Sequence, residues 1–121
     1  MPQKVLIVDD SLFIRTMLRD ILKEAGYEVA GEAVDGSEAL NKFRDLNPDL
    51  VTLDIIMPGN QGLSVLKDMV KINPGAKVVM ISALGQDTLV DEALKSGASG
   101  YIVKPFQDDR VIEEVRRALE E

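Results

Sequence analysis

Polar side chains follow directly after four short apolar runs of the sequence. They are Asp9 and Asp10, Asp54, Ser82 and Lys104. Carboxylates brought close together repel one another, and either raised pKa values or a bound cation relieves the repulsion. Ligation by oxygen alone favours Mg²⁺, which uses few protein carboxylates, keeps several waters and accepts phosphate oxygens. An aspartate on such an ion beside a lysine can accept a phosphoryl group, because the cations neutralise the transferred oxygens.

Each of these residues also has a structural explanation when it is taken alone. An Asp-Asp pair before a helix often caps that helix and interacts favourably with its dipole. A lone aspartate at a strand end, a lone serine and a Lys-Pro turn are mostly structural as well. Their joint placement after successive strands is what favours a functional site.

The composition restricts the chemistry that is open to the chain. Its 121 residues include no cysteine and no histidine, which excludes disulfides, thiolate metal sites and imidazole as ligand, base or phosphate acceptor. With 21 acidic and 14 basic residues the net charge is -7, which repels nucleic acid and anionic membrane surfaces. There is no apolar run of about 18 residues and no secretory leader. We therefore expect a cytoplasmic protein that binds neither nucleic acid nor membranes directly.

Strand and helix patterns alternate along the chain. Four runs are almost purely apolar, as is typical of parallel strands covered on both faces. They are residues 5–8, 50–53, 78–81 and 101–103. A fifth run, residues 28–33, mixes charge and glycine with small apolar residues and is predicted to be an edge strand. The length matches one domain, so residues 1–121 are expected to form a single domain.

Segments of helical periodicity separate these strands. Apolar residues recur at helical spacing within residues 14–25, 39–46, 63–70, 89–94 and 111–119. Ser11 is the predicted N-cap of the first helix and Gly26 its stop. The pattern predicts an α/β fold of the (βα)5 type, a doubly wound parallel sheet for which the flavodoxin-like strand order 2-1-3-4-5 is the common form.

The expected strand order decides where the polar residues meet. Ligands of open α/β sheets bind outside the carboxyl ends of the strands, at the point where the strand order reverses. In the order 2-1-3-4-5, the first and third strands flank that point. Asp9, Asp10 and Asp54 should therefore face one another, with Ser82 and Lys104 beside them.

Four stretches of sequence resemble the receiver domains of two-component response regulators. They are VLIVDDS, PDLVTLDIIMP, VVMISALG and GYIVKPF. The resemblance covers essentially the whole chain, and within the family SALGQ and KPFQ are most similar to the chemotaxis regulators. It implies a phosphorylation-activated switch with a role in chemotaxis. A stand-alone receiver in a different phosphorelay is the alternative.

The resemblance also implies how the acceptor and the metal are held. Asp54 matches the phosphoacceptor of the family and a ligand of Mg²⁺. Asp10 matches the acid that ligates the metal directly, and Asp9 the acid that orients metal-bound water. The backbone carbonyl of Ile56 matches the third protein ligand.

Further matches imply how the switch works. Ser82 matches the hydroxyl that closes on the phosphoryl group, Tyr101 the aromatic rotamer switch and Lys104 the cation that contacts phosphate, while Pro105 resembles the cis proline of the family. A histidine kinase is the implied phosphodonor. The implied output face comprises the fourth helix, the fifth strand and the fifth helix, and its expected partner is a protein such as a flagellar motor switch protein. A phosphatase is a further expected partner.

Two other classes of protein share parts of this pattern. A Mg²⁺-dependent aspartyl phosphatase would also use carboxylates. Members of that class generally have a nucleophile at the first strand and a second acid two residues later, and Asp9-Asp10-Ser11-Leu12 lacks this spacing. A flavodoxin-like cofactor binder needs N–H donors after the first strand to hold phosphate, which acidic Asp9 and Asp10 oppose. We expect a switch that promotes its own phosphorylation and dephosphorylation, not a multiple-turnover enzyme.

Ile56 and Leu84 depart from the family pattern. The best-known chemotaxis regulators carry polar residues at the matching positions, two residues after the acceptor and two after the hydroxyl residue. Apolar side chains cannot orient an attacking water there, so slower self-dephosphorylation is expected.

Overall fold

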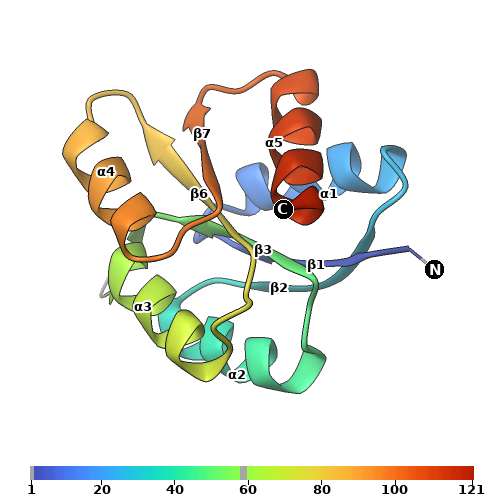
Figure 1. Ribbon diagram of the computed structural model, residues 1–121. Coiled ribbons are helices and arrows are strands. Elements are labelled where there is room, and N and C mark those ends of the chain that lie inside the picture. The colour runs from blue at the N-terminus through green and yellow to red at the C-terminus, as the bar shows by residue number, and fades with distance from the viewer. Residues whose placement is uncertain (1, 58–59) are drawn as a thin grey trace.

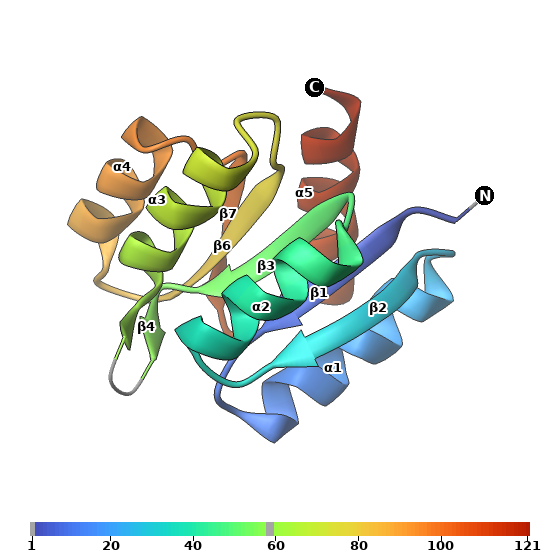
Figure 2. The ribbon, with the colours of Figure 1, turned by 90° about the horizontal axis from the view of Figure 1, so that it is seen from below.

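The structure is a computed structural model that describes the backbone of residues 2–57 and 60–121. Five parallel strands form its main sheet, in the order β2-β1-β3-β6-β7. They are β1 (Lys4–Val8), β2 (Glu28–Ala33), β3 (Leu50–Asp54), β6 (Val78–Ala83) and β7 (Gly100–Lys104). Counted along the main sheet alone, this is the predicted order 2-1-3-4-5, and Figure 2 shows the strands side by side.

Helices cover both faces of the sheet, which explains the unbroken apolar strands. They are α1 (Leu12–Glu24), α2 (Gly36–Leu46), α3 (Gly62–Ile72), α4 (Asp87–Lys95) and α5 (Asp108–Glu120). Helices α1 and α5 lie on one face, and α2, α3 and α4 lie on the other (Figure 1). Successive residues of a strand point to opposite faces. Accordingly Val5 and Ile7 pack with the α1–α5 layer, while Leu6 and Val8 pack in the opposite core.

The edge strand β2 is where the sequence predicted it. It pairs only with β1 in the main sheet, and most of its residues are half-buried or exposed. The pairing brings Glu32 opposite Ile7 and Ala33 opposite Val8. The carboxyl end of β2 therefore lies beside the segment that follows β1.

The loop that leaves β1 is ended sharply by a helix cap. Ser11 has extended backbone angles, and its hydroxyl accepts a hydrogen bond from the Ile14 N–H at 3.3 Å, as the sequence predicted. Such a cap satisfies one of the free N–H groups of the first helical turn. Only Asp9, Asp10 and Ser11 separate β1 from α1, so both aspartates are confined to the carboxyl edge of the sheet.

A short antiparallel hairpin was not predicted from the sequence. It consists of β4 (Ile56–Met57) and β5 (Asn60–Gln61), and it lies between β3 and α3. Two-residue strands are too short to produce a periodic pattern, so hydrophobic periodicity cannot detect them. The hairpin nevertheless matters for the site, because it begins two residues after Asp54.

Both ends of the described chain lie at the amino edge of the sheet, away from the acidic residues. Lys4 begins β1, and at the other end Lys77, which precedes β6, donates from Nζ to the carbonyl oxygen of Glu121 at 2.8 Å. Helix α5 therefore runs back from the carboxyl edge to the amino edge. Within the described ranges, no helix is long and apolar enough to cross a membrane.

Gly62 lies where the chain passes closest to the end of β3. A Cβ at this position would lie 2.0 Å from the carbonyl oxygen of Asp54 and 2.8 Å from the Cα of Ile55. Both atoms belong to the backbone, so no side-chain rotation can relieve the overlap. The start of α3 is thereby packed against the strand that carries Asp54.

We predict that Gly62→Ala lowers the free energy of unfolding by more than about 2 kcal/mol, because the backbone of β3 must shift to admit the methyl group. Gly75→Ala is the matched control, since its Cβ would contact only Asn73 Oδ1 at 3.4 Å, and it should change stability by less than about 0.5 kcal/mol. Urea denaturation measures both variants. Equal stabilities would contradict the close approach.

Candidate functional site

The carboxyl ends of β1 and β3 bring three aspartates together. Val8 pairs with Leu53, so Asp9, which follows β1, and Asp54, the last residue of β3, lie at the same level of neighbouring strands. Asp9, Asp10 and Asp54 each offer a carboxylate oxygen, and these oxygens all lie within 4.8 Å of one another. The predicted convergence of the three side chains is therefore confirmed. In the described part of the chain, no other group of three acidic side chains is close enough to share a metal ion.

The three carboxylates differ in their exposure to solvent. Asp9 is fully buried and Asp54 is 7 % exposed, whereas Asp10 lies at the surface. Burial raises the pKa of Asp54 above its usual value, and the neighbouring charge of Asp9 raises it further. Lys104 and the backbone N–H of Ile56, which donates to Asp54 Oδ1 at 3.3 Å, act in the opposite direction. The site is open to solvent on the Asp10 side.

Lys104 supplies the cation of the site from the last residue of β7. Its Nζ lies 3.3 Å from Asp9 Oδ2 and 3.5 Å from Asp54 Oδ2, so one ammonium is shared between two carboxylates. The contact with Asp9 is an ion pair without hydrogen-bond geometry, and Asp9 Oδ2 has no hydrogen-bond partner among the described residues. The peptide bond between Lys104 and Pro105 is cis, as the resemblance implied.

A second buried carboxylate shows how unusual this balance is. Glu114 of α5 is also buried, but each of its oxygens is paired with its own guanidinium, from Arg110 at 2.9 Å and from Arg117. In the acidic cluster, three carboxylates face one ammonium among the described residues, so the acidic charge is not balanced when all of these groups are ionised. This uncompensated charge and the all-oxygen donor set suit a hard divalent cation such as Mg²⁺.

Ser82 lies beside the cluster on the neighbouring strand. Asp54 pairs with Ile81, so Ser82 is one residue further toward the carboxyl edge. The Ser82 side chain is buried, and its hydroxyl oxygen has no hydrogen-bond partner among the described residues. A buried hydroxyl without a partner is rare in folded proteins. It makes Ser82 available to a group that arrives at Asp54.

Tyr101 is not part of the acidic cluster. It pairs with Met80, two residues before Ser82, and its partly buried side chain lines a hollow of about 200 Å³ between β7 and α4. Val90, Leu94 and Val103 supply apolar walls of that hollow. The predicted switch residue thus lies on the edge strand β7, beside α4.

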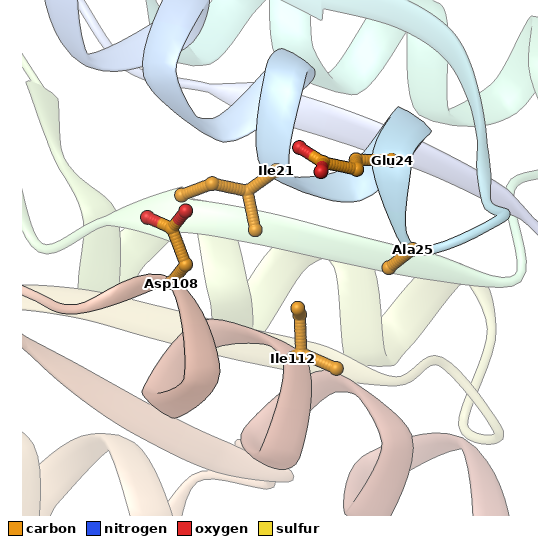
Figure 3. Close-up of a pocket in the computed structure, with 5 residues that line it drawn as sticks. All are labelled: Ile21, Glu24, Ala25, Asp108 and Ile112. Carbon is orange, nitrogen blue, oxygen red and sulfur yellow. The ribbon is translucent and has the colours of Figure 1, made fainter.

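A different hollow, of about 160 Å³, lies between α1 and α5 (Figure 3). Ile112 points from α5 toward α1, Ile21 and Ala25 complete the apolar lining, and Glu24 and Asp108 lie at its sides. None of the predicted site residues lines it. This hollow is therefore separate from the acidic cluster.

Comparison with known proteins agrees with this geometry. The model of the response regulator receiver domain matches residues 5–116. The chain belongs to the response-regulator receiver family. The chemotaxis protein CheY of Thermotoga maritima is 52 % identical over 117 residues, which cover 97 % of this chain and 98 % of that protein. The receiver domain described here is thus similar in extent to a whole CheY.

Solved receiver structures share the fold. CheY in the CheX–CheY–BeF3–Mg²⁺ complex of Borrelia burgdorferi is 41 % identical, with a TM-score of 0.90 over 95 % of this chain and 87 % of that one. NtrX of Brucella abortus is 39 % identical, with a TM-score of 0.94 over 99 % of this chain. The receiver spans only 27 % of that longer NtrX chain.

One contact of the acidic loop gave no signal in the sequence. Arg15 reaches from α1 to the backbone carbonyl of Asp9 and to the Glu32 side chain of β2. Arg15 and Glu32 are 17 residues apart, and an arginine on an amphipathic helix is ordinarily read as a surface residue. The contact forms because the pairing of β1 with β2 brings Asp9 and Glu32 close together.

We predict that Asp54→Asn stabilises the metal-free receiver at pH 7 by about 1 kcal/mol, because it removes a buried charge beside Asp9. The raised pKa means that Asp54 binds a proton more tightly in the folded state than in the unfolded state. Protonated Asp54 therefore contributes to the folding stability of the wild type in acid, and this contribution is lost as the pH rises through the raised pKa. The gain from the variant should therefore shrink in acid. Denaturation with a chelator present measures it.

Asp91→Asn, on the exposed surface of α4, is the control for this experiment and should leave stability within about 0.5 kcal/mol of the wild type. A lower stability of Asp54→Asn than of wild type at pH 7 would contradict the inferred cost of burying the Asp54 charge.

Proposed function

We propose that this receiver is a phosphorylation-activated switch in which Asp54 accepts a phosphoryl group from a histidine kinase in the presence of Mg²⁺. The observation that carries the proposal is the arrangement of three carboxylates with oxygens within 4.8 Å of one another and Lys104 Nζ 3.5 Å from Asp54. Family membership supports it independently. The proposal describes a switch that undergoes one reversible modification, not a multiple-turnover enzyme.

The proposed reaction is an in-line transfer to Asp54. A carboxylate oxygen attacks phosphorus, the new oxygen–phosphorus bond forms, and the bond to the imidazole nitrogen of the donor breaks with its electron pair leaving on that nitrogen. Lys104 neutralises charge on the transferred oxygens. When bound, Mg²⁺ supplies further neutralisation of the same oxygens. Solvent exposure beside Asp10 provides the side from which a donor approaches.

Four groups form the proposed metal site. Asp10 and Asp54 would contribute carboxylate oxygens directly, Asp9 would orient water on the ion, and Ile56 would contribute its backbone carbonyl. The small number of protein ligands agrees with the preference of Mg²⁺ for retaining water. The Borrelia burgdorferi CheX–CheY complex contains Mg²⁺, which supports the same metal for this receiver.

The proposed output involves Ser82, Tyr101 and the face formed by α4, β7 and α5. Phosphorylation adds acceptor oxygens at Asp54, and a hydrogen bond from Ser82 to these oxygens draws its strand end inward. Tyr101 then turns toward the vacated space and changes the α4 surface. By analogy with the CheY relatives, the pathway is chemotaxis in the cytoplasm and the target is a protein such as a flagellar motor switch protein.

A phosphatase is a further proposed partner of this receiver. The Borrelia burgdorferi structure contains CheY with a second protein, CheX. It supports the view that receivers of this kind meet partners other than the kinase and the output target.

We predict that incubation with acetyl phosphate adds one phosphoryl group to the wild type only when Mg²⁺ is present. Asp54→Asn should show no gain because its amide cannot serve as the acceptor carboxylate, whereas the exposed control Asp91→Asn should be modified like the wild type. Intact-mass measurement with Mg²⁺ and with a chelator tests this. Full modification of Asp54→Asn would refute the site, and steady hydrolysis of a phosphomonoester would instead favour a Mg²⁺-dependent phosphatase.

The surroundings of Asp54 also bear on the lifetime of the phosphorylated state. Ile56 is 51 % exposed and Leu84 is 79 % exposed, which is unusual for large apolar side chains. Ile56 lies two residues after Asp54, and Leu84 directly follows the neighbouring strand β6. Side chains of this kind crowd the approach of a hydrolytic water without orienting it.

We predict that the double variant Ile56→Asn, Leu84→Glu releases phosphate roughly tenfold faster, which corresponds to a barrier lower by about 1.4 kcal/mol. Ile72→Asn, at the exposed end of α3, is the control and should leave the rate unchanged. A phosphate-release time course measures all three proteins. Unchanged or slower release from the double variant would show that Ile56 and Leu84 do not limit access of water.

A further inference from the structure

Arg15 connects the acidic loop to the neighbouring strand through two hydrogen bonds. One terminal nitrogen of the guanidinium donates to the backbone carbonyl oxygen of Asp9 at 2.7 Å, and its Nε donates to Glu32 Oε1 at 3.0 Å. The Arg15 side chain is only 11 % exposed. Hydrogen bonds of a charged guanidinium are stronger than neutral ones, and the planar group fixes their directions. The Arg15 contacts therefore restrain the position of the Asp9 carbonyl relative to Glu32.

The carbonyl that Arg15 holds belongs to the peptide bond between Asp9 and Asp10. The N–H of Asp9 is fixed as well, because it donates to the carbonyl oxygen of Ala33 on β2 at 3.0 Å. A peptide unit is planar, so holding its oxygen also sets the positions of the next nitrogen and Cα. The hydrogen bond from Arg15 thereby restrains the backbone at the Asp9–Asp10 peptide bond.

Asp10 needs such support more than its neighbours do. Asp9 is buried, accepts a hydrogen bond from the Ser11 N–H at 2.9 Å and lies beside Lys104. Asp10 is exposed, and no hydrogen bond or ion pair of its carboxylate is found among the described residues. Its position at the cluster depends on the backbone from which it extends.

Glu32 gives Arg15 a fixed anchor. Its second oxygen, Oε2, accepts from Arg19 at 3.2 Å, and its backbone carbonyl accepts from Lys42 Nζ. Glu32 pairs with Ile7 across the two strands. The next residue, Ala33, accepts the hydrogen bond from the Asp9 N–H through its carbonyl oxygen. Glu32 is thus held from both helices flanking β2, its carboxylate by Arg19 of α1 and its backbone carbonyl by Lys42 of α2.

We propose that Arg15 is a positioning residue for the divalent-cation site: anchored by Glu32, it fixes the Asp9–Asp10 peptide plane so that the Asp10 carboxylate reaches the cluster. This inference rests on the proposed function, because it assigns Arg15 a part in binding the proposed Mg²⁺. Arg15 does not touch the metal or the phosphoryl group. Removing a group that orients a metal ligand typically weakens metal binding by about 10- to 100-fold.

Arg19 offers a matched control on the same helix. It contacts the same Glu32 carboxylate, but no contact between Arg19 and Asp9 is found in the described structure. If Arg15 only clamped α1 to β2, Arg15→Met and Arg19→Met would have similar effects on the metal. If Arg15 positions Asp10, only Arg15→Met should weaken metal binding.

The test is calorimetric titration of Mg²⁺ into metal-free wild type, Arg15→Met and Arg19→Met, together with thermal unfolding of each protein in chelator. We expect Arg15→Met to raise the Kd for Mg²⁺ by about tenfold or more and Arg19→Met to change it less than about twofold. The rate of phosphorylation of Arg15→Met by acetyl phosphate should recover at high Mg²⁺ concentration, which a general loss of structure would not allow.

Arg15→Lys and Glu32→Gln keep the test decisive if Arg15→Met fails to fold. The lysine can reach Asp9 or Glu32 but cannot bridge both, and the glutamine removes the charge that anchors Arg15, so both should raise the Kd to an intermediate value. Equal Kd values for wild type and the Arg15 variants, or equal losses in Arg15→Met and Arg19→Met, would overturn the positioning role alone. Absence of Mg²⁺ binding by the wild type would overturn the proposed function as well.

Discussion

Mutual repulsion of the aspartates at the carboxyl edge is the constraint on which the rest of the structure depends. Two of the three carboxylates are nearly or fully buried, and in the described part of the chain both contact a single cation, Lys104. Burial strengthens the repulsion because less water screens it. The fold must therefore hold the acids by other means, through strand pairing, the Ser11 cap and the backbone contacts of the loop.

Those means are distributed over most of the molecule. The pairing of β1 with β3 sets the spacing of Asp9 and Asp54, and the end of β7 brings Lys104 to both. The packing of two helical layers against the sheet keeps these strands in place, since both faces are buried. A site that requires unfavourable charge is thus supported by the largest favourable contribution available, which is apolar burial.

Much of this arrangement follows from local sequence. β-branched runs predict the strands, helical spacing predicts the helices, and the rule that ligands lie at carboxyl ends brings Asp9, Asp10 and Asp54 together. Ser11 could be identified as a cap because hydroxyls at helix starts accept backbone N–H bonds. Each of these inferences depends on residues that are close in the chain or on a general rule of topology.

What could not be predicted depends on distances between residues far apart in the sequence. The β4–β5 hairpin is too short for a periodic signal, and the contact of Arg15 with Asp9 and Glu32 exists only because two strands pair in one particular register. The lack of a hydrogen-bond partner for the Ser82 hydroxyl among the described residues likewise depends on packing, since the sequence looks the same whether or not a serine is bonded.

The two ends of the described chain lie at the same edge of the sheet, which has a practical consequence for labelling and immobilisation. Lys4 and Glu121 lie at the amino edge, and the acidic cluster lies at the opposite edge. A fluorophore, an affinity handle or a surface tether attached at either end would sit across the full length of the strands from Asp54. Immobilised receivers in a biosensor would therefore present the carboxyl edge to the solution, whichever end is attached.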